Sequence, residues 1–323
     1  MFRKKSNRLR HKKRGIRLGF TIVFLNVLLW TTGLGMWYFD GEGNRFLAEF
    51  FRDEVDYLDS SSGYLAPDIA NEPPLSILSE NAILINITTG EVLFEQRADD
   101  LAHPASLTKM MTTLLGATRT PDEVVSVVAN FQALHAANAS MAGFSYGEFR
   151  TLNEVLHGAM LTSGADATAT IANYIGGSYE GFVTLMNEKA HQIGLMNTTF
   201  TNASGLHHQN QVTTARDMAN LVIYAIENET FLNVFTAENF TLSTQSKEGR
   251  TIFSTMFVTL GSPHVNGGTI LGGKDGFTPE AGLCLASIAT DGENKFVLVT
   301  MGGRSVGAHV NDARHIYGHF LGN

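Results

Sequence analysis

The chain has 323 residues, of which 44% are hydrophobic and 17% charged, so it holds enough apolar material for a packed core and is not disordered over most of its length. Nine of its 23 basic residues precede residue 18 and no acidic residue precedes Asp40, which leaves 14 basic against 31 acidic residues in 40–323. That part of the chain would repel a phosphate backbone, so we do not expect a nucleic acid as a partner.

The N-terminal segment predicts a membrane anchor. Residues 18–39 contain no charged side chain, and at about 1.5 Å per residue such a helix can cross a hydrocarbon core of about 30 Å. The alternative, a cleavable signal peptide, would have a shorter apolar region that ends in small residues, whereas this run ends in Met36-Trp37-Tyr38-Phe39. The positive-inside rule keeps the basic tail, residues 1–17, in the cytoplasm. We therefore expect a single-pass cell-membrane protein whose remaining residues are extracytoplasmic.

A stalk is expected to follow the membrane helix. Residues 40–77 contain Ser60-Ser61-Ser62-Gly63 and Pro73-Pro74 and show no sustained hydrophobic period, which is typical of a connecting segment. We expect one domain after it, over residues 78–323.

The predicted elements of this domain are strands first, then helices, then strands and a closing helix. The sequence predicts a hairpin of strands 82–87 and 92–96, and a buried helix over 106–115 that opens after Pro104. Further helices are expected at 152–161, 165–175 and 180–193, a second hairpin at 282–290 and 295–301, and a last helix at 310–321. This order favours the α+β class, with an antiparallel sheet built from both ends of the domain and a helical part inserted between them.

The first candidate for chemistry is Ser106-Leu107-Thr108-Lys109, the one Ser-x-x-Lys tetrapeptide in the chain. On a helix, positions i and i+3 share a face, so the lysine amine can approach the serine hydroxyl. A lysine that is partly desolvated or near another cation has a lowered pKa and can activate a weak alcohol as a nucleophile. The tetrapeptide alone is weak, because a chain of this size contains about one such match by chance.

Further sequence stretches support Ser106 and Lys109 as a catalytic pair. Four stretches in this order resemble the serine D-alanyl-D-alanine carboxypeptidases, which are the low-molecular-mass penicillin-binding proteins: 82–112 with the Ser-x-x-Lys, 161–167 with Leu161-Thr162-Ser163-Gly164, 186–218 with Asn202-Ala203-Ser204-Gly205-Leu206, and 273–282 with Gly273-Lys274-Asp275-Gly276. The resemblance runs from about residue 78 to 320. It implies a penicillin-binding-protein-like sheet flanked by helices with a helical subdomain.

The resemblance also implies a reaction and a set of catalytic residues. It makes Ser106 the acylated nucleophile and Lys109 its base, and Ser163 the hydroxyl that relays a proton to the leaving amine. The implied reaction removes the terminal D-alanine from peptidoglycan stem peptides, and β-lactams would be covalent inhibitors. No metal and no organic cofactor is expected.

The last of the four stretches, 273–282, implies the substrate-binding residues. Lys274 would lie on a strand that faces the nucleophile, where its charge attracts the terminal carboxylate of the substrate. The backbone N–H groups of Ser106 and Phe277 would form the oxyanion hole. Gly276 fits this place because a bare backbone lets the substrate lie close to the strand.

Two positions depart from the family pattern. Ala165 stands where the family usually has Asn, and Asp275 stands where it usually has Thr or Ser. Asp275, counted with the substrate-binding residues, would bring a carboxylate near the substrate's own carboxylate, at a cost on the order of a kcal/mol or more. A catalytically impaired protein that binds peptidoglycan or a cell-wall partner is therefore kept as an alternative, and a β-lactamase or an endopeptidase as others.

Two further residues are interpreted as structural. The single cysteine, Cys284, lies in an apolar run and is expected to be a small buried side chain rather than a nucleophile. The pentapeptide Gly143-Phe144-Ser145-Tyr146-Gly147 matches the nucleophile-elbow motif, which requires a strand before it and a helix directly after it. The flanking residues predict neither, so we expect a turn here.

Overall fold

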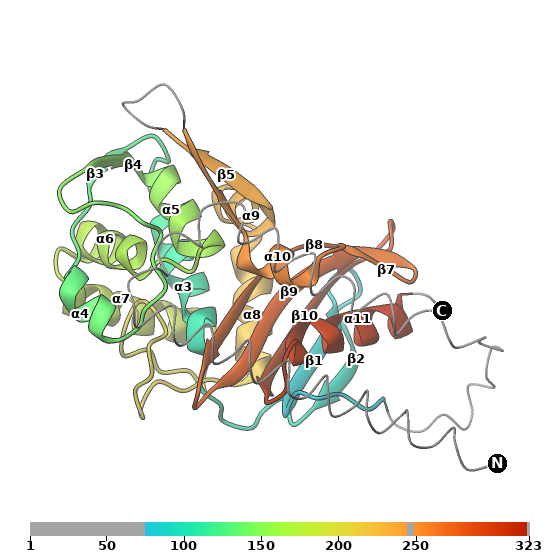
Figure 1. Cartoon of the computed structure of the whole chain (residues 1–323). Coiled ribbons are helices and arrows are strands. Elements are labelled where there is room, and N and C mark those ends of the chain that lie inside the picture. The colour runs from blue at the N-terminus through green and yellow to red at the C-terminus, as the bar shows by residue number, and fades with distance from the viewer. Residues whose placement is uncertain (1–74, 244–248, 322–323) are drawn as a thin grey trace, which may run out of the picture. The chain divides into compact units, whose positions relative to one another are not determined.

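A six-stranded antiparallel sheet forms the centre of the domain, with strand order β2-β1-β10-β9-β8-β7 (Figure 1). The computed structural model describes residues 75–243 and 249–321. The strands are β1 (Asn81–Asn86), β2 (Glu91–Gln96), β7 (His264–Val265), β8 (Gly268–Thr278), β9 (Gly282–Thr290) and β10 (Lys295–Gly303). The sheet therefore joins the start of the domain to its end, as the order of elements predicts.

Both faces of the sheet are covered, because side chains that alternate along each strand pack into two different cores. Ile83 and Ile85 of β1 lie in the core that contains α8 (Ala215–Ala225), whereas Leu84 lies in the core that contains α10 (Thr255–Leu260) and α11 (Ala308–Phe320). A strand buried on both sides has no polar face, which explains why β1 reads as a continuous apolar run.

The helical part is inserted between β2 and β7 and lies to the left in Figure 1. It starts with the 3₁₀ turn η2 (Ala105–Leu107) and α3 (Thr108–Gly116), and a capping box between Thr151 and Glu154 begins α5. The other elements are α4 (Phe131–Ala136), α5 (Leu152–Leu161), α6 (Ala165–Gly176), α7 (Tyr179–Gln192) and α9 (Glu229–Thr236), with the two-stranded sheets β3 (Val124–Ser126) with β4 (Phe149–Thr151), and β5 (Asn239–Leu242) with β6 (Arg250–Phe253).

The predicted hairpins and helices of the domain are confirmed within two residues at each end. The residue patterns did not predict α4, α8, α9, α10, β7, β8 or the two small sheets. The predicted tail 1–17, the predicted membrane helix 18–39 and nearly all of the predicted stalk 40–77 lie outside the described residues. Within 75–243 and 249–321, no helix is both long and apolar enough to cross a membrane.

Candidate active site

Ser106 and Lys109 meet at the start of α3. Ser106 lies in the 3₁₀ turn η2 and Lys109 one turn later on α3, so the predicted i,i+3 geometry brings the lysine Nζ to 3.0 Å from the serine Oγ. The same Nζ donates to the backbone carbonyl of Ser204, which lies 95 residues further along the chain. Lys109 is 3% exposed, so its amine is held by two oxygens in a site that is nearly closed to bulk water.

The surroundings of Lys109 favour a neutral amine. Burial lowers its pKa, and the nearby Lys274 ammonium lowers it further, whereas Asp275 and Asp166 act in the opposite direction. The result is a pKa well below the ordinary value of 10.5. A neutral lysine in contact with a serine hydroxyl can accept its proton, so the geometry and the charge balance both suit a general base.

Two glycines let other segments touch the nucleophile. A Cβ on Gly276 of β8 would lie 2.7 Å from the backbone N of Ser106, and a Cβ on Gly205 would lie 1.9 Å from the carbonyl oxygen of Ala105. Gly205 also has φ +84°, a conformation that favours glycine. The loop at 202–206 and strand β8 are thereby packed directly against the turn that carries Ser106.

Phe277 follows Gly276 on β8, and its side chain is 61% exposed. Because its amide nitrogen is bonded to Gly276, which contacts Ser106, this part of the backbone lies beside the nucleophile. An exposed aromatic ring at the edge of the site is free to contact a substrate.

Lys274 and Asp275 form an ion pair on β8. The Lys274 Nζ lies 3.0 Å from Asp275 Oδ1 and donates to the Asp275 backbone carbonyl at 2.6 Å, with the lysine side chain 1% and the aspartate side chain 17% exposed. Thr255 of α10 donates from Oγ1 to the same Oδ1 at 2.5 Å. Burial raises the pKa of Asp275, but Lys274 and the Thr255 hydrogen bond together hold it below its ordinary value. The charge of Lys274 is therefore already compensated by a carboxylate of the protein itself.

His309 of α11 interacts electrostatically with both members of this pair. It is 4% exposed, and its Nδ1 has no hydrogen-bond partner among the residues that the structure describes. Burial lowers its pKa, and Lys274 adds to this, whereas the carboxylates of Asp275 and Asp312 oppose it. A neutral imidazole leaves Asp275 with Lys274 as its main counter-ion.

Ser163 sits in a strained turn just before α6. Its φ is +58°, which is unusual for a residue with a side chain, and its hydroxyl is buried without a partner among the described residues. Ala105, next to the nucleophile, has φ +45°. Strain of this kind costs of order 1–3 kcal/mol per residue and is found at functional sites, where the surrounding structure imposes it.

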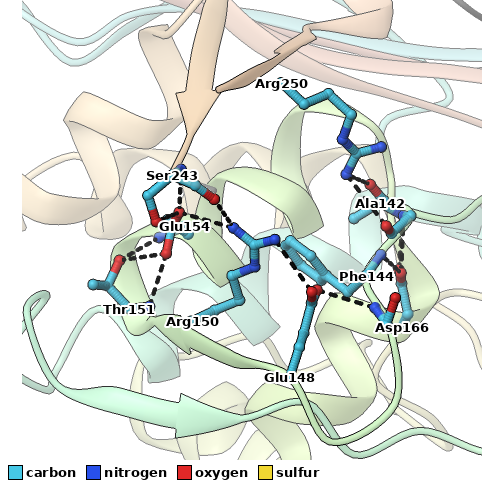
Figure 2. Close-up of polar contacts among 11 residues, drawn as sticks. Ala142, Phe144, Glu148, Arg150, Thr151, Glu154, Asp166, Ser243 and Arg250 are labelled. Carbon is cyan, nitrogen blue, oxygen red and sulfur yellow. Dashed lines mark hydrogen bonds and ion pairs between the residues drawn. The ribbon is translucent and has the colours of Figure 1, made fainter. Parts of the chain in front are cut away.

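Asp166, near the start of α6, holds the backbone of loop 142–144, as Figure 2 shows. Its carboxylate accepts hydrogen bonds from the backbone N–H groups of Ala142 at 2.7 Å, Gly143 at 3.0 Å and Phe144 at 3.0 Å. Arg250 of β6 donates to the Ala142 carbonyl at 2.5 Å from the other side. The loop 142–144 is thus tied to both α6 and β6 by a buried carboxylate and a guanidinium.

A second cluster in Figure 2 holds the β5–β6 hairpin to the helical part. The Ser243 N–H and hydroxyl donate to Glu154 Oε1 at 2.6 and 2.7 Å, and Arg150 pairs with Glu154 at 3.3 Å and with Glu148 at 3.2 Å. Because β6 also carries Arg250, these contacts help to fix loop 142–144.

Ala165, one of the two positions that depart from the family pattern, is the first residue of α6 and is buried, and its N–H donates to the Ser140 carbonyl at 2.7 Å.

Cys284 is fully buried, and burial raises its pKa to about 12, so it is inert as expected. The Gly-x-Ser-x-Gly segment at 143–147 ends in a turn that leads into the short strand β4, so it does not form a nucleophile elbow. Within 75–243 and 249–321, no group of three or more His, Cys, Asp or Glu residues is placed to hold a metal ion.

Comparison with known proteins identifies the family to which the chain belongs. A sequence profile of the D-alanyl-D-alanine carboxypeptidases matches residues 68–305. The chain belongs to the D-alanyl-D-alanine carboxypeptidase family. It is 31% identical to the D-alanyl-D-alanine carboxypeptidase DacF of Bacillus subtilis over 251 residues, which are 75% of this chain and 61% of that protein. It is 30% identical to DacC of Escherichia coli over 246 residues, 72% of this chain and 59% of that one. The match thus spans about three fifths of these relatives.

Solved structures share the fold. The crystal structure of the Streptomyces K15 DD-transpeptidase superposes with a TM-score of 0.69 at 27% identity, and the match covers 78% of this chain and all of that one. The D-alanyl-D-alanine carboxypeptidase DacD of Francisella tularensis, at 23% identity, has a TM-score of 0.66, with 81% of this chain and 75% of that chain covered. The predicted α+β fold of the penicillin-binding proteins and β-lactamases is therefore confirmed for the domain.

The structure brings together the predicted residues Ser106 and Lys109, places Gly276 against them, and pairs Lys274 with Asp275. Sequence reasoning gave no role to four residues that shape the site: Ser204, Thr255, His309 and Asp166. Ser204 and Asp166 lie in stretches that resemble the family, and this was the available signal. Thr255 and His309 lie on α10 and α11, and nothing in their local sequence points to the site.

Proposed function

We propose that this protein is a serine D-alanyl-D-alanine carboxypeptidase that trims peptidoglycan stem peptides through an acyl-enzyme. The observation that carries the proposal is the contact of Lys109 Nζ with Ser106 Oγ at 3.0 Å, together with the lowered pKa of that lysine. Membership of the family and the names of the relatives DacF and DacC supply the substrate class.

The reaction would proceed in two steps. Ser106 Oγ attacks the carbonyl carbon between the two D-alanines while Lys109 takes its proton, and the oxyanion is held by the N–H groups of Ser106 and Phe277. The C–N bond then breaks, and the leaving amine receives the proton through the Ser163 hydroxyl, which releases D-alanine. In the second step, water attacks the ester, frees the shortened peptide and returns a proton to Ser106. Lys274 would attract the terminal carboxylate.

The test is the intact mass of the protein after incubation with benzylpenicillin. Ring opening adds the whole penicillin to the protein, and the adduct should map to the peptide that contains Ser106. Ser106→Ala should abolish the adduct, and Lys109→Ala should stop its formation because the nucleophile loses its base. Ser145→Ala, the same change in the turn at 143–147, is the matched control and should keep the adduct. An adduct that survives in Ser106→Ala contradicts the assignment.

One observation favours a second function. Asp275 compensates Lys274, and Ala165 supplies no amide, so the site offers less to a substrate carboxylate and backbone than the family pattern does. A protein that binds peptidoglycan without turning it over would show measurable affinity for stem peptides but no penicillin adduct. A β-lactamase would release the opened penicillin within the time of the experiment, and an endopeptidase would cleave cross-linked peptides.

We further propose that residues 18–39 anchor the domain to the outer side of a bacterial cell membrane, with residues 1–17 in the cytoplasm. The charge step between Arg17 and Asp40 supports this orientation. Protease added to intact spheroplasts should digest the chain after Asp40. Complete protection of the domain would contradict this topology.

A further inference from the structure

Two consecutive peptide units lie between a cation and an anion, as Figure 2 shows. The Ala142 carbonyl accepts a hydrogen bond from Arg250 at 2.5 Å. The N–H of the same peptide unit, which belongs to Gly143, donates to Asp166 at 3.0 Å. In the next unit, the Gly143 carbonyl lies 3.4 Å from the guanidinium, and the Phe144 N–H donates to Asp166 at 3.0 Å. Each peptide group thus turns its negative end to the guanidinium and its positive end to the carboxylate, and hydrogen bonds in such a chain strengthen one another.

The guanidinium of Arg250 packs against bare backbone. Gly143 has φ +79°, a conformation that favours glycine, and a Cβ at this position would lie 2.5 Å from Nη1 of Arg250. A side chain here would therefore push the guanidinium away from the Ala142 carbonyl. The close contact between the arginine and the loop thus depends on a glycine at position 143.

The strand that carries Arg250 is held at both ends. Arg250 is the first residue of β6. At this end of the hairpin, Ser243 donates its N–H and its hydroxyl to Glu154 of α5 at 2.6 and 2.7 Å. At the other end, the Ser254 N–H donates to the Glu238 carbonyl at 2.8 Å. The arginine therefore reaches the loop from a strand that is itself fixed to the rest of the domain.

The loop held in this way touches the turn that carries Ser163. The next residue, Gly164, has no side chain, and a Cβ there would lie 2.6 Å from the Cβ of Ala142 and 2.7 Å from its backbone N. One residue later, the Ala165 N–H donates to the Ser140 carbonyl at 2.7 Å. Both residues that follow Ser163 are thus in direct contact with the loop, so a shift of the loop has to move the turn.

We propose that Arg250 is a positioning residue for Ser163, and that it acts through the Ala142 peptide and not by contact with the substrate. The inference rests on the proposed function, in which the Ser163 hydroxyl relays a proton to the leaving amine. That hydroxyl is buried without a hydrogen-bond partner among the described residues, and the φ of +58° is imposed by the surrounding structure. Its direction is therefore set by the neighbouring backbone, which Arg250 and Asp166 hold from opposite sides.

The test compares two substrates that differ only in the leaving atom. One is a peptide that ends in D-Ala-D-Ala, and the other is the matching thioester, in which 2-mercaptopropanoate replaces the terminal D-alanine. An amine must receive a proton before it leaves, whereas a thiolate leaves as an anion. Arg250→Met should lower kcat/KM about tenfold for the peptide and less than about twofold for the thioester, because a misplaced hydroxyl impairs only the proton relay. Ser163→Ala should show the same selectivity with a larger loss.

Further variants distinguish positioning from a general loss of structure. In the Ser163→Ala background, Arg250→Met should cause no additional loss with the peptide, because the hydroxyl that it positions is absent. Arg250→Lys keeps a charged donor and should retain more activity than Arg250→Met. Arg314→Met is the matched control, since Arg314 also donates to two backbone carbonyls, which lie at and just after the end of α10. Equal losses of Arg250→Met with the two substrates, or additive losses in the double variant, would overturn the proposal.

Hydrogen exchange followed by mass spectrometry tests the contact without the reaction. In Arg250→Met, peptides that cover 142–144 and 163–166 should exchange severalfold faster than in the wild type, and in Arg314→Met they should not. Gly143→Ala, which displaces the guanidinium from the side of the loop, should have the same effect as Arg250→Met. Faster exchange in a protein that forms no penicillin adduct supports the link and contradicts the carboxypeptidase. An adduct on Ser106 with unchanged exchange at 163–166 supports the carboxypeptidase and contradicts the link.

Discussion

Neutralising Asp275 should make the protein a better carboxypeptidase. In the structure, Lys274 Nζ lies 3.0 Å from Asp275 Oδ1. A substrate carboxylate that binds the same Nζ at about 3 Å would have its oxygen within about 6 Å of the Asp275 oxygen. Two unit charges at about 6 Å repel by about 0.7 kcal/mol in water and by about 2.8 kcal/mol at an effective dielectric constant of about 20. The partly buried site lies between these limits, and about 1.4 kcal/mol corresponds to a factor of ten.

The assay is kcat/KM for a peptide that ends in D-Ala-D-Ala, measured for the wild type, Asp275→Asn and Asp275→Thr. Both variants should be about tenfold faster at neutral pH. The matched substrate is the same peptide with a terminal carboxamide, which carries no charge and should gain little from either substitution. Because Asp275 raises the pKa of Lys109, its removal should also shift the rising limb of the pH profile to lower pH.

Folding has to be checked in these variants, because each leaves the buried Lys274 without its counter-ion. Breaking a buried pair on one side costs about 3–5 kcal/mol, so thermal unfolding should show a lower midpoint. The variants remain informative wherever they are folded at the assay temperature. Equal kinetics for wild type and both variants on the carboxylate substrate would refute the placement of Asp275 as a barrier to carboxylate binding.

Three further predictions concern the other groups of the site. Ser163→Gly should raise the free energy of unfolding by about 1 kcal/mol, because it removes the φ +58° strain and a buried hydroxyl without a partner among the described residues, yet it should slow acylation by benzylpenicillin. Chemical denaturation measures the first effect and mass spectrometry of the penicillin adduct the second. Ser163→Ala keeps the strain, so this variant should be less stable than Ser163→Gly. Asp166→Ala should lower the free energy of unfolding by roughly 3–5 kcal/mol, since it leaves the N–H groups of loop 142–144 without their acceptor; denaturant unfolding that matches the wild type would contradict this role. Acylation should fall as the pH drops through the lowered pKa of Lys109, because only the neutral amine accepts a proton, and Lys109→Arg should be inactive at every pH. Since the folded protein releases this proton more readily than the unfolded chain, stability should rise with pH between the two pKa values, and this rise should vanish in Lys109→Met.

The sequence by itself determined the local geometry of the nucleophile and the class of fold. Ser106 and Lys109 are three residues apart on a helical turn, so their contact follows from helix geometry once that turn is formed. The two hairpins and helix α5 could equally be predicted from the sequence, because turn residues and apolar runs are local signals. The family resemblance then added the roles of residues far apart in the chain.

Strand β8 shows what only the tertiary structure decided. Residue patterns alone do not predict this strand, because glycine weakens a strand and four of the 11 residues of β8 are glycines. They are Gly268, Gly272, Gly273 and Gly276. In the fold, a Cβ at each of these positions would come within 2.7 Å of backbone atoms from other segments, such as Phe235 O for Gly272 and Ser106 N for Gly276. The ion pair of Lys274 with Asp275, the hydrogen bond from Thr255 and the carbonyl of Ser204 on Lys109 depend on the same long-range packing. A local pattern cannot contain these contacts, because each joins groups whose distance is set by how the sheet and the helical part close around them.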